Sequence, residues 1–433
     1  MKTVYVVMCA EFIHPGHINI IRVARELGEV TVGLATDEFN GRHKRVTVMS
    51  YEQRRAIVEN IKGVAHVIAQ DTLDLAPILR ELKPDYFVHG DDWKTGRLSA
   101  VRQQVIDLLK EWGGALIEPP YTGGISSTKL NAAWRSRGTT PELRIQHFRR
   151  LLAYQPFIRI LEVHSGLAGL VVEQTQVKVD DRRKEFDAMW FSRRTDSLAR
   201  GKPDIDYVDL TSQLHTIHEI LEPTTKPLIV DGGNGGIKEH FSFTVRTLER
   251  LGVSAVVVED LIQVKGRAFS RDGIRPEQED GSDFARKISL GKQAQVGTGF
   301  SIIVRISSPI LRSGYEDALL RTQTYVEAGA DAVMIQSEAG NLTQFLEFCR
   351  LFSKSVGRVP LLMALPPYSP CSESQLADVG IRAVIYSDHL LRAAYTNMLL
   401  AAKMLLRNSR ALDVDGFCAP LDEICNVVPG FPK

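Results

Sequence analysis

Eight short apolar runs between residues 157 and 388 constrain the fold of this chain more than any other feature. They read FIRILEV, FDAMWF, PLIVDGG, AVVVEDL, FSIIVRI, AVMIQS, PLLMALP and AVIYSD. Most of the intervals between them hold an amphipathic helical stretch, such as FTVRTLERLG. Eight strand–helix repeats over ~250 residues are the number and size of a (β/α)8 barrel. The sequence therefore predicts such a barrel over residues 156–433.

The first ~120 residues also alternate strand and helix patterns. Apolar runs such as VYVVM, EVTVGLA and AHVIA are separated by helical patterns such as HINIIRVAREL. This alternation predicts an open parallel sheet with helices on both faces, whose ligands bind at the carboxyl ends of the strands. Residues 129–155 are rich in Arg and contain the turn-like run RGTTPE. We therefore expect an α/β protein with a Rossmann-like domain over 1–135, a linker over 136–155 and the barrel after it.

The composition excludes several classes of protein. The chain has 53 Lys and Arg against 52 Asp and Glu, so no global positive field exists to attract nucleic acid. No apolar stretch approaches the ~18 residues expected of a membrane span. The five cysteines lack CxxC spacing, which is typical of reduced thiols. We expect a cytoplasmic protein that binds neither nucleic acid nor membrane.

Two short motifs in the first domain predict a nucleotide site. His14 and His17 lie in the run HPGH, which follows the first predicted strand and opens a helix. Two imidazoles at this spacing can approach a triphosphate together, aided by the N–H groups of the helix N-terminus. The run GISST (124–128) places hydroxyl groups at the start of a later helix. A His pair at a helix start can be a simple cap, but the two motifs together are more specific.

On these motifs, residues 3 to about 130 resemble the nucleotidylyltransferases that include the glycerol-3-phosphate and ethanolamine-phosphate cytidylyltransferases. The resemblance implies CTP as the nucleotide, assisted by Mg²⁺, with His14 and His17 stabilising the transition state at the α-phosphate. It also implies that phosphates are held by Lys44, Ser126, Ser127 and Thr128.

Two further positions bear on this resemblance. The run GDDW (90–93) resembles the family's nucleotide-side loop. Tyr121 replaces the Arg that usually begins the last motif, a loss for which Arg42, Lys44, Arg45 or Arg54 could compensate.

Polar residues end many of the eight predicted strands of the barrel, and such ends form a single rim. They are Glu162, His164, Ser192, Asp231, Glu259, Asp260, Arg305, Gln336, Ser337, Asp388 and His389. Three acids from different strands and an Arg could hold a divalent cation and an anionic substrate. The alternative is that single acids cap the helices that follow.

Residues 157 to about 430 resemble phosphoenolpyruvate mutase of the isocitrate lyase superfamily, on segments such as LEVHSGL, EHFSFTVRTLERLGVSAV and HLLRAAY. The resemblance implies Asp204 beside the migrating phosphoryl group, Asp231 as a Mg²⁺ ligand and Glu259 holding metal-bound water. It further implies Lys265 on a loop that closes over the substrate, Arg305 binding the anion and Ser192 cradling the substrate carboxylate.

The barrel also departs from the pattern of this family. Gly233 replaces the second acid of a DxD pair, and Leu261 replaces the first Lys of the hallmark EDKxxxKxNS. Further replacements are Arg267 for Asn, Ala268 for Ser, Gln336 for His, and Arg193 and Arg194 for small carboxylate-binding residues. The three arginines could hold an anion in a different way, and the alternative for Arg193 and Arg194 is that they are solvated.

The order of the two domains resembles that of bifunctional enzymes of fosfomycin biosynthesis. We expect a bifunctional phosphonate-biosynthesis enzyme. Its barrel would isomerise phosphoenolpyruvate to phosphonopyruvate with Mg²⁺, and its first domain would use CTP to cytidylylate a phosphonate such as 2-hydroxyethylphosphonate. The alternatives are a barrel that hydrolyses phosphonopyruvate and a non-catalytic barrel beside an active cytidylyltransferase. The superfamily resemblance also implies a homo-oligomer formed by exchange of the helix LRAAYTNMLLAAKMLLRN.

Overall fold

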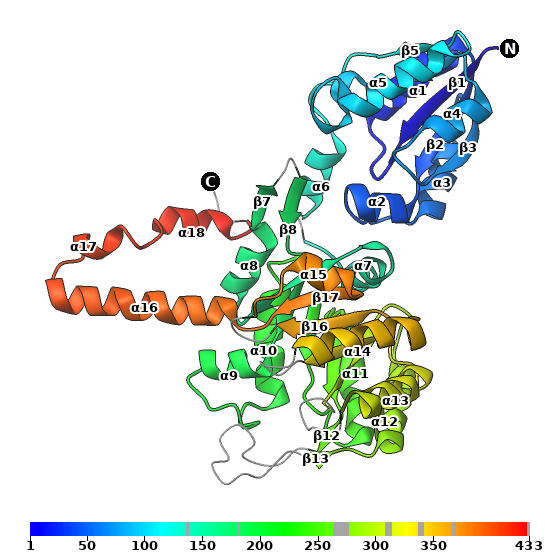
Figure 1. Cartoon of the computed structure of the whole chain (residues 1–433). Coiled ribbons are helices and arrows are strands. Elements are labelled where there is room, and N and C mark those ends of the chain that lie inside the picture. The colour runs from blue at the N-terminus through cyan, green and yellow to red at the C-terminus, as the bar shows by residue number, and fades with distance from the viewer. Residues whose placement is uncertain are drawn as a thin grey trace. The chain divides into compact units, whose positions relative to one another are not determined.

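A computed structural model of the chain describes residues 1–135, 138–179, 182–262, 277–307, 314–336, 342–365 and 369–430. The chain forms two compact units (Figure 1). The first unit comprises Met1–Arg137 with Tyr154–Pro156, and the second comprises Gly138–Ala153 with Phe157–Lys433.

The first unit is a five-stranded parallel sheet in the order β3-β2-β1-β4-β5. Its strands are β1 (Thr3–Met8), β2 (Glu29–Ala35), β3 (Val64–Gln70), β4 (Tyr86–Val88) and β5 (Ala115–Ile117). Its helices are α1 (Pro15–Leu27), α2 (Asp37–His43), α3 (Tyr51–Glu59), α4 (Ala76–Leu82), α5 (Ser99–Lys110) and α6 (Ser127–Arg135). The predicted Rossmann-like sheet is confirmed, and its strand order reverses between β1 and β4, where ligands of such sheets bind.

Both faces of the central strand β1 are buried because its residues alternate between two apolar clusters. Val4 and Val6 pack in one cluster with Ile21 of α1, whereas Tyr5 packs in the other with Leu79 of α4 and with the apolar face of α5. Full burial of each such large side chain stabilises the sheet by about 1.5–3 kcal/mol. The packing fixes the carboxyl end of β1, from which the histidine motif continues.

The second unit is a closed barrel of eight parallel strands in the order β10-β11-β14-β15-β16-β17-β6-β9. All eight predicted apolar runs form its strands. They are β6 (Ile158–Val163), β9 (Ala188–Phe191), β10 (Leu228–Asp231), β11 (Ala255–Glu259), β14 (Ser301–Ile306), β15 (Ala332–Gln336), β16 (Leu361–Leu365) and β17 (Ile381–Tyr386). The predicted (β/α)8 barrel is therefore confirmed.

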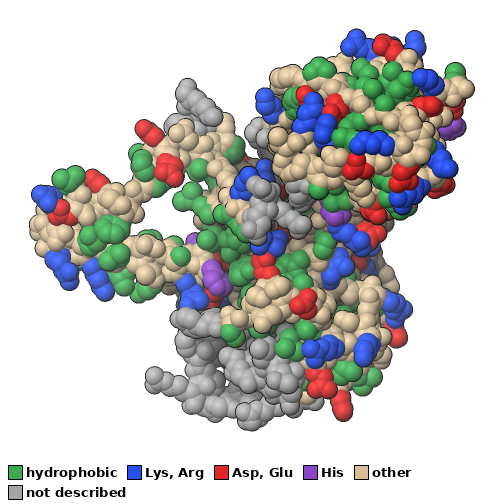
Figure 2. All heavy atoms as spheres, turned by 45° about the horizontal axis from the view of Figure 1, so that its top comes forward, with side chains coloured by type: hydrophobic (Ala, Val, Ile, Leu, Met, Phe, Trp, Pro, Cys, Tyr) green, Lys and Arg blue, Asp and Glu red, His purple; other side chains and the backbone are tan. Residues whose placement is uncertain are grey.

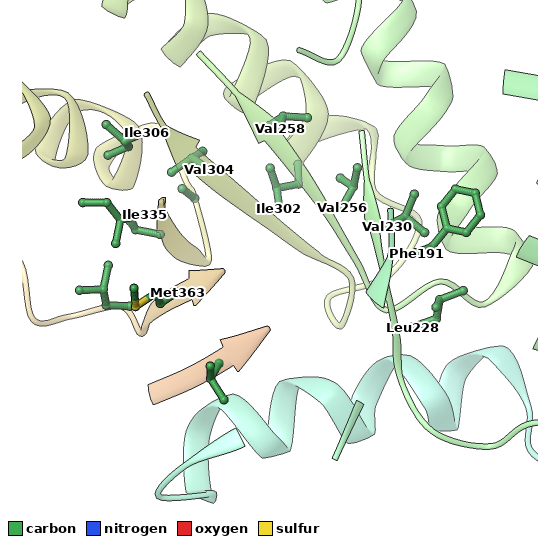
Figure 3. Close-up of a cluster of buried hydrophobic side chains, with 14 of the residues drawn as sticks. Phe191, Leu228, Val230, Val256, Val258, Ile302, Val304, Ile306, Ile335 and Met363 are labelled. Atoms are coloured by element: carbon green, nitrogen blue, oxygen red, sulfur yellow. The ribbon is translucent and has the colours of Figure 1, made fainter. Parts of the chain in front are cut away.

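Figure 3 shows the apolar cluster that includes Val256, Val258, Ile302 and Val304 of β11 and β14. The same cluster contains Phe241, Val245, Phe284 and Ile288 of the surrounding helices, so these strand residues face the helical layer. Side chains alternate along a strand, so Glu259 and Arg305 face the barrel interior. Glu259 and Arg305 are also paired across β11 and β14, which brings their side chains together at the rim.

The surrounding helices are α8 (Gly166–Gln174), α9 (Arg193–Ala199), α10 (Leu210–Leu221), α11 (Lys238–Leu251), α12 (Gly281–Ala294), α13 (Gly314–Glu327), α14 (Leu342–Ser355) and α15 (Glu373–Asp378). Two small sheets pair β7 (Gln176–Val179) with β8 (Arg182–Glu185) and β12 (Leu261–Ile262) with β13 (Glu277–Gln278).

The segment expected as a linker contains a helix, α7 (Pro141–Tyr154), most of which belongs to the barrel unit. Ile145 and Phe148 of α7 are buried. The guanidinium of Arg144 donates hydrogen bonds to the carbonyls of Leu221, at 2.8 Å, and of Thr224. Thr224 lies shortly before β10, so α7 packs at the amino-terminal end of the strands, opposite the rim that carries the polar residues.

The second unit ends in a projecting arm made of α16 (His389–Asn408), α17 (Leu412–Asp415) and α18 (Leu421–Val427) (Figure 1). No residue of α16 is buried. Figure 2 shows apolar side chains spread over the surface of this arm, among which Tyr395, Met398, Leu406 and Phe417 are more than half exposed. Among the described helices, α16 included, none is long and apolar enough to cross a membrane.

Candidate functional sites

The histidine motif lies at the first turn of α1. His14 is the N-cap residue, and its Nδ1 accepts a hydrogen bond of 3.1 Å from the backbone N–H of Gly16. Because Nδ1 accepts, the proton of neutral His14 is on Nε2, which can donate to a ligand. The rings of His14 and His17 lie 4.1 Å apart between centroids. A Cβ at position 16 would lie 2.8 Å from Cε1 of His14, so this turn requires glycine.

The electrostatics of this motif keep both imidazoles neutral. Burial, followed by the charges of His14 and Lys44, lowers the pKa of His17 to about 4. Burial and the charge of Lys44 also lower the pKa of His14. The Nδ1 atom of His17 is buried without a hydrogen-bond partner in the part of the chain that the structure describes. The motif therefore offers N–H donors and the positive charge of Lys44 to an anion.

The structure connects the second motif to the first. Asn19 of α1 donates a hydrogen bond of 3.0 Å to the hydroxyl of Thr122, just before the GISST run. The hydroxyl of Ser126 accepts the N–H of Lys129 at 3.1 Å, so Ser126 caps α6. Ser127 and Thr128 therefore occupy the first turn of this helix, where backbone N–H groups and the helix dipole favour phosphate. Asn19 was not predicted from the sequence. Its position one turn into α1, after the two histidines, was the signal that could have identified it.

The GDDW loop after β4 is tied to the end of β5. The indole of Trp93 stacks on His89 at 4.1 Å and donates to Glu118 at 2.8 Å. The hydrogen bond from Arg102 is the main cause that lowers the pKa of Glu118 to about 2. The N–H of Tyr121 donates to Asp91 at 2.9 Å. The ends of β4 and β5 are therefore held together beside the point where the strand order reverses.

Lys44 is the strongest of the four cations considered as a replacement for the missing Arg at position 121. Arg54 is fully buried against Asp37, at 2.9 Å. Arg45 pairs with Glu11 at 2.6 Å, and Arg42 pairs with Glu38. Within residues 1–135, no ion pair occupies Lys44, whose charge reaches both histidines. Lys44 therefore has its charge available for phosphate.

In the barrel, three predicted residues meet at the rim. Asp231 ends β10, Glu259 ends β11, and Arg305 lies near the end of β14. Arg305 donates to Glu259 at 2.7 Å and to Asp231 at 3.4 Å. Burial lowers the pKa of Arg305, but the charges of Asp231 and Glu259 outweigh it and raise that pKa above its ordinary value. Arg305 remains charged, and it neutralises much of the negative charge of the two acids.

Arg193 lies beside Gly233, the position at which the sequence resemblance leads one to expect a second acid. Gly233 has a backbone φ of +58°, and a Cβ built on it would collide with Nη1 of Arg193. Arg193 also forms an ion pair with Asp206, and its side chain is 22% exposed. A side chain at position 233 would therefore displace this guanidinium, the flexible end of Arg193. The structure therefore decides against a solvated Arg193, and it adds Asp206, which the sequence analysis missed although it lies two residues after Asp204.

The other predicted residues of the barrel are placed as follows. Asp204 pairs with Arg194 at 3.1 Å, and Ser192 is buried at the end of β9. Leu261 is buried in β12. Lys265, Arg267, Ala268 and Ser337 lie outside the described residues, as does the side chain of Gln336.

Glu162 and His164 have a role that the sequence did not indicate. The carboxylate of fully buried Glu162 lies 2.7 Å from Nδ1 of His164 and accepts the N–H of Leu391, in the first turn of α16, at 3.3 Å. These contacts fix the start of the projecting arm against β6.

Comparisons with known proteins agree with this geometry. Residues 148–406 match the family model described as phosphoenolpyruvate phosphomutase. The chain belongs to the phosphoenolpyruvate phosphomutase family. It is 30% identical over 298 residues to the phosphoenolpyruvate phosphomutase of Streptomyces hygroscopicus, which covers 68% of this chain and 90% of that relative.

Within this family, the barrel is also similar to a hydrolase. The crystal structure of phosphonopyruvate hydrolase in complex with oxalate and Mg²⁺ matches with a TM-score of 0.58 at 26% identity. The match covers 66% of this chain and 94% of that chain. The similarity therefore extends to a phosphomutase and to a hydrolase, and it does not separate the two activities.

The first unit matches a second family model. Residues 7–133 match the cytidylyltransferase-like model. A stretch of 82 residues is 44% identical to FAD synthase of Archaeoglobus fulgidus, covering 19% of this chain and 60% of that relative. The chain thus joins a cytidylyltransferase-like domain to a barrel of the phosphoenolpyruvate phosphomutase family.

The hydrolase structure contains Mg²⁺, so the rim residues of this barrel are compared with the ligands that a divalent cation needs. Asp231 and Glu259 share Arg305, and the guanidinium of Arg193 occupies the space beside Gly233. With Asp206, which pairs with Arg193, the cluster has three carboxylates and two guanidinium groups, and carboxylate oxygens are the ligands that Mg²⁺ prefers. No group of three or more His, Cys, Asp or Glu able to hold a metal occurs among the described residues. At this rim a divalent cation would be held by Asp231 and Glu259, which in this structure pair with Arg305.

Proposed function

We propose that the first domain transfers a nucleotidyl group from CTP to a small phosphonate such as 2-hydroxyethylphosphonate. An oxygen of the phosphonate attacks the α-phosphorus, a new P–O bond forms, and the bond to pyrophosphate breaks. Mg²⁺ accompanies the nucleotide as part of the substrate. The observation that carries this proposal is the pair of neutral imidazoles beside the charge of Lys44 at the first turn of α1.

The residues of this domain contribute position and charge. His14 and His17 donate N–H groups toward the α-phosphate, while Lys44 offsets the negative charge that is spread over the phosphates. The first turn of α6, with Ser127 and Thr128, offers donors to the rest of the triphosphate. No covalent intermediate is needed, because the two reacting oxygens only have to be held in line.

Pyrophosphate release tests this proposal directly. The full-length protein is incubated with Mg²⁺, 2-hydroxyethylphosphonate and either CTP or ATP, with a control that lacks the phosphonate. We expect release that depends on the phosphonate and is faster with CTP. Equal or faster release with ATP would contradict the choice of base, and no release with either nucleotide would contradict nucleotidyl transfer.

We also propose that the barrel isomerises phosphoenolpyruvate to phosphonopyruvate, as a step of phosphonate biosynthesis. The P–O bond to the enol oxygen breaks and a P–C bond forms at the methylene carbon, so atoms balance without water. Asp204, Arg305 and Ser192 come from the parts of the barrel that supply its rim, and the phosphomutase relative supports this activity. The positive charge of guanidinium groups would offset the negative charge of the moving phosphoryl group.

Hydrolysis is the second candidate, because the barrel also resembles phosphonopyruvate hydrolase. The two are separated by following phosphonopyruvate with ³¹P NMR, with Asp204→Ala as a control. Conversion to phosphoenolpyruvate is the expected result. Release of inorganic phosphate would identify a hydrolase, and no change would leave a barrel that only binds or assembles, in line with buried Leu261 replacing a family Lys.

We further infer a homo-oligomer in the cytoplasm. The arm of α16 to α18 exposes large apolar side chains, which a second copy of the chain could cover. Light scattering should give a mass above that of one chain, and a single-chain mass would contradict the oligomer. All five cysteines are free thiols, as in a reducing compartment, and cell fractionation tests the location.

A further inference from the structure

Asp260 follows Glu259 at the end of β11, and its side chain points away from the rim. Side chains alternate along a strand, so Asp260 faces the helical layer when Glu259 faces the barrel interior. Asp260 is fully buried, and its Oδ2 accepts a hydrogen bond of 3.0 Å from the hydroxyl of Tyr325 in α13. Asp260 is therefore a buried acid that the chemistry proposed for the barrel does not use.

The backbone of Asp260 leaves the regular pairing of β11 with β14. Its N–H donates to the carbonyl of Arg305 at 3.3 Å, as in a parallel ladder. The next bond of such a ladder would join the N–H of Ser307 to the carbonyl of Asp260. Instead, that N–H donates to the side chain, to Oδ1 of Asp260 at 3.0 Å, and the carbonyl accepts the N–H of Glu279 at 2.9 Å. The carboxylate thus replaces a ladder acceptor where the chain turns into β12.

Further donors hold the carboxylate in this position. Its Oδ2 accepts the side-chain amide of Gln278, in β13, at 2.7 Å, in addition to the hydroxyl of Tyr325. Arg321 of α13 lies 3.5 Å from the same oxygen, and it donates to the carbonyl of Glu279 at 2.8 Å. A buried polar network in which the groups are paired favours a single arrangement, so these contacts fix the Asp260 side chain.

Arg305 lies between the two hydrogen bonds that Asp260 forms with this part of the chain. The first fixes the carbonyl of Arg305, and the second fixes the N–H of Ser307, two residues further on. Glu259 immediately precedes Asp260, and its carboxylate accepts the Nε–H of Arg305 at 3.0 Å. The separation of the Glu259 and Arg305 backbones at the rim therefore depends on the Asp260 carboxylate.

We infer that Asp260 is a positioning residue of the barrel site, which holds Arg305 against Glu259 by completing the β11–β14 ladder with its carboxylate. The contact between Asp260 and Ser307 carries this inference. Its effect on turnover rests on the function proposed for the barrel, whereas its effect on the position of Arg305 does not.

NMR of arginine side chains tests the inference without the use of activity. In the full-length protein labelled with ¹⁵N, the Nε–H of Arg305 should give a resonance that exchanges slowly with water, assigned by its loss in Arg305→Lys. Asp260→Ala removes the acceptor of the Ser307 N–H, so this resonance should move to the position of exposed arginines or broaden. Circular dichroism melting checks that the variant is folded. An unchanged Arg305 resonance in folded Asp260→Ala would overturn the inference.

Two further variants separate the acceptor from general stability. Asp260→Asn keeps an oxygen for the N–H of Ser307 and should keep the Arg305 resonance, and this test stands if Asp260→Ala does not fold. Loss of the resonance in folded Asp260→Asn would contradict the inference. Tyr325→Phe removes a partner of Oδ2 only, so it should lower the melting temperature and leave the resonance unchanged. A lost resonance in folded Tyr325→Phe would show that any destabilisation disturbs the rim, and it would also contradict the inference.

Turnover of phosphonopyruvate extends the test to the proposed function. A misplaced Arg305 should lower kcat/KM by about 10²-fold in Asp260→Ala, while Tyr325→Phe stays close to the unmodified protein. An equal loss in both variants would contradict a positioning role. If the unmodified barrel does not convert phosphonopyruvate, the isomerase proposal fails, and the Arg305 resonance still decides this inference.

Discussion

The two sites of this chain handle charge in opposite ways. At the first site, the described contacts of His14, His17 and Lys44 include no carboxylate, so their N–H groups and charge are directed at a ligand. At the barrel rim, the acids Asp231 and Glu259 are paired internally with Arg305. A site with uncompensated cations selects anions directly, whereas an internally paired ionic cluster must exchange partners before it binds. The presence of the histidine motif in the first domain therefore says little about how the barrel binds its ligand.

The largest expected effect separates the two sites. His17→Asn should reduce pyrophosphate release from CTP by about 10²–10³-fold, because one donor to the transition state is lost. Conversion of phosphonopyruvate by the barrel should not change, since His17 lies in the first unit. Parallel assays on the same preparation measure both. Loss of both together would contradict independent sites.

The next effect concerns the ionic cluster of the barrel. Arg305→Ala leaves Asp231 and Glu259, each 13% exposed, without their shared partner. Removing one member of a largely buried ion cluster costs about 3–5 kcal/mol of unfolding free energy. Urea unfolding followed by barrel tryptophan fluorescence measures it. A change below about 1 kcal/mol would mean that water already screens these charges and would weaken the contrast between the sites.

A smaller effect is expected at the cap of α6. Ser126→Ala removes the hydroxyl that accepts the N–H of Lys129, which costs about 1 kcal/mol of local helix stability. The Michaelis constant for CTP should rise several-fold, while conversion of phosphonopyruvate stays as in the unmodified protein. Ser99→Ala, in the first turn of α5, is a control within the same unit. An equal rise in both variants would show a general loss of stability.

The smallest effect is a change in the pKa of one histidine. NMR titration should give His17 a pKa of about 4, and Lys44→Gln should move it upward because a repelling charge is removed. The unfolded chain binds a proton at His17 near pH 6.5, whereas the folded chain does not. The unfolding free energy of the first unit should therefore fall as pH decreases from about 6.5 to 4. An unchanged pKa in Lys44→Gln would show that burial and His14 set it without Lys44.

Local sequence patterns determined much of this structure. Both strand sets form as predicted, because strand burial leaves period-two or continuous apolar runs that can be recognised without knowing their partners. The histidine motif was also evident, since His14, Gly16 and His17 act within one helical turn. Asp231, Glu259 and Arg305 meet as expected, because parallel strands of a barrel end at the same rim.

Tertiary structure alone decided the features that depend on distant partners. The segment expected as a linker holds α7, whose buried face is covered by barrel residues far along the chain, such as Leu221 and Thr224. The pairing of Arg45 with Glu11 and of Arg54 with Asp37 leaves Lys44 as the cation whose charge reaches both histidines. Arg193 is largely buried beside Gly233, and contact between residues so distant in sequence leaves no local pattern.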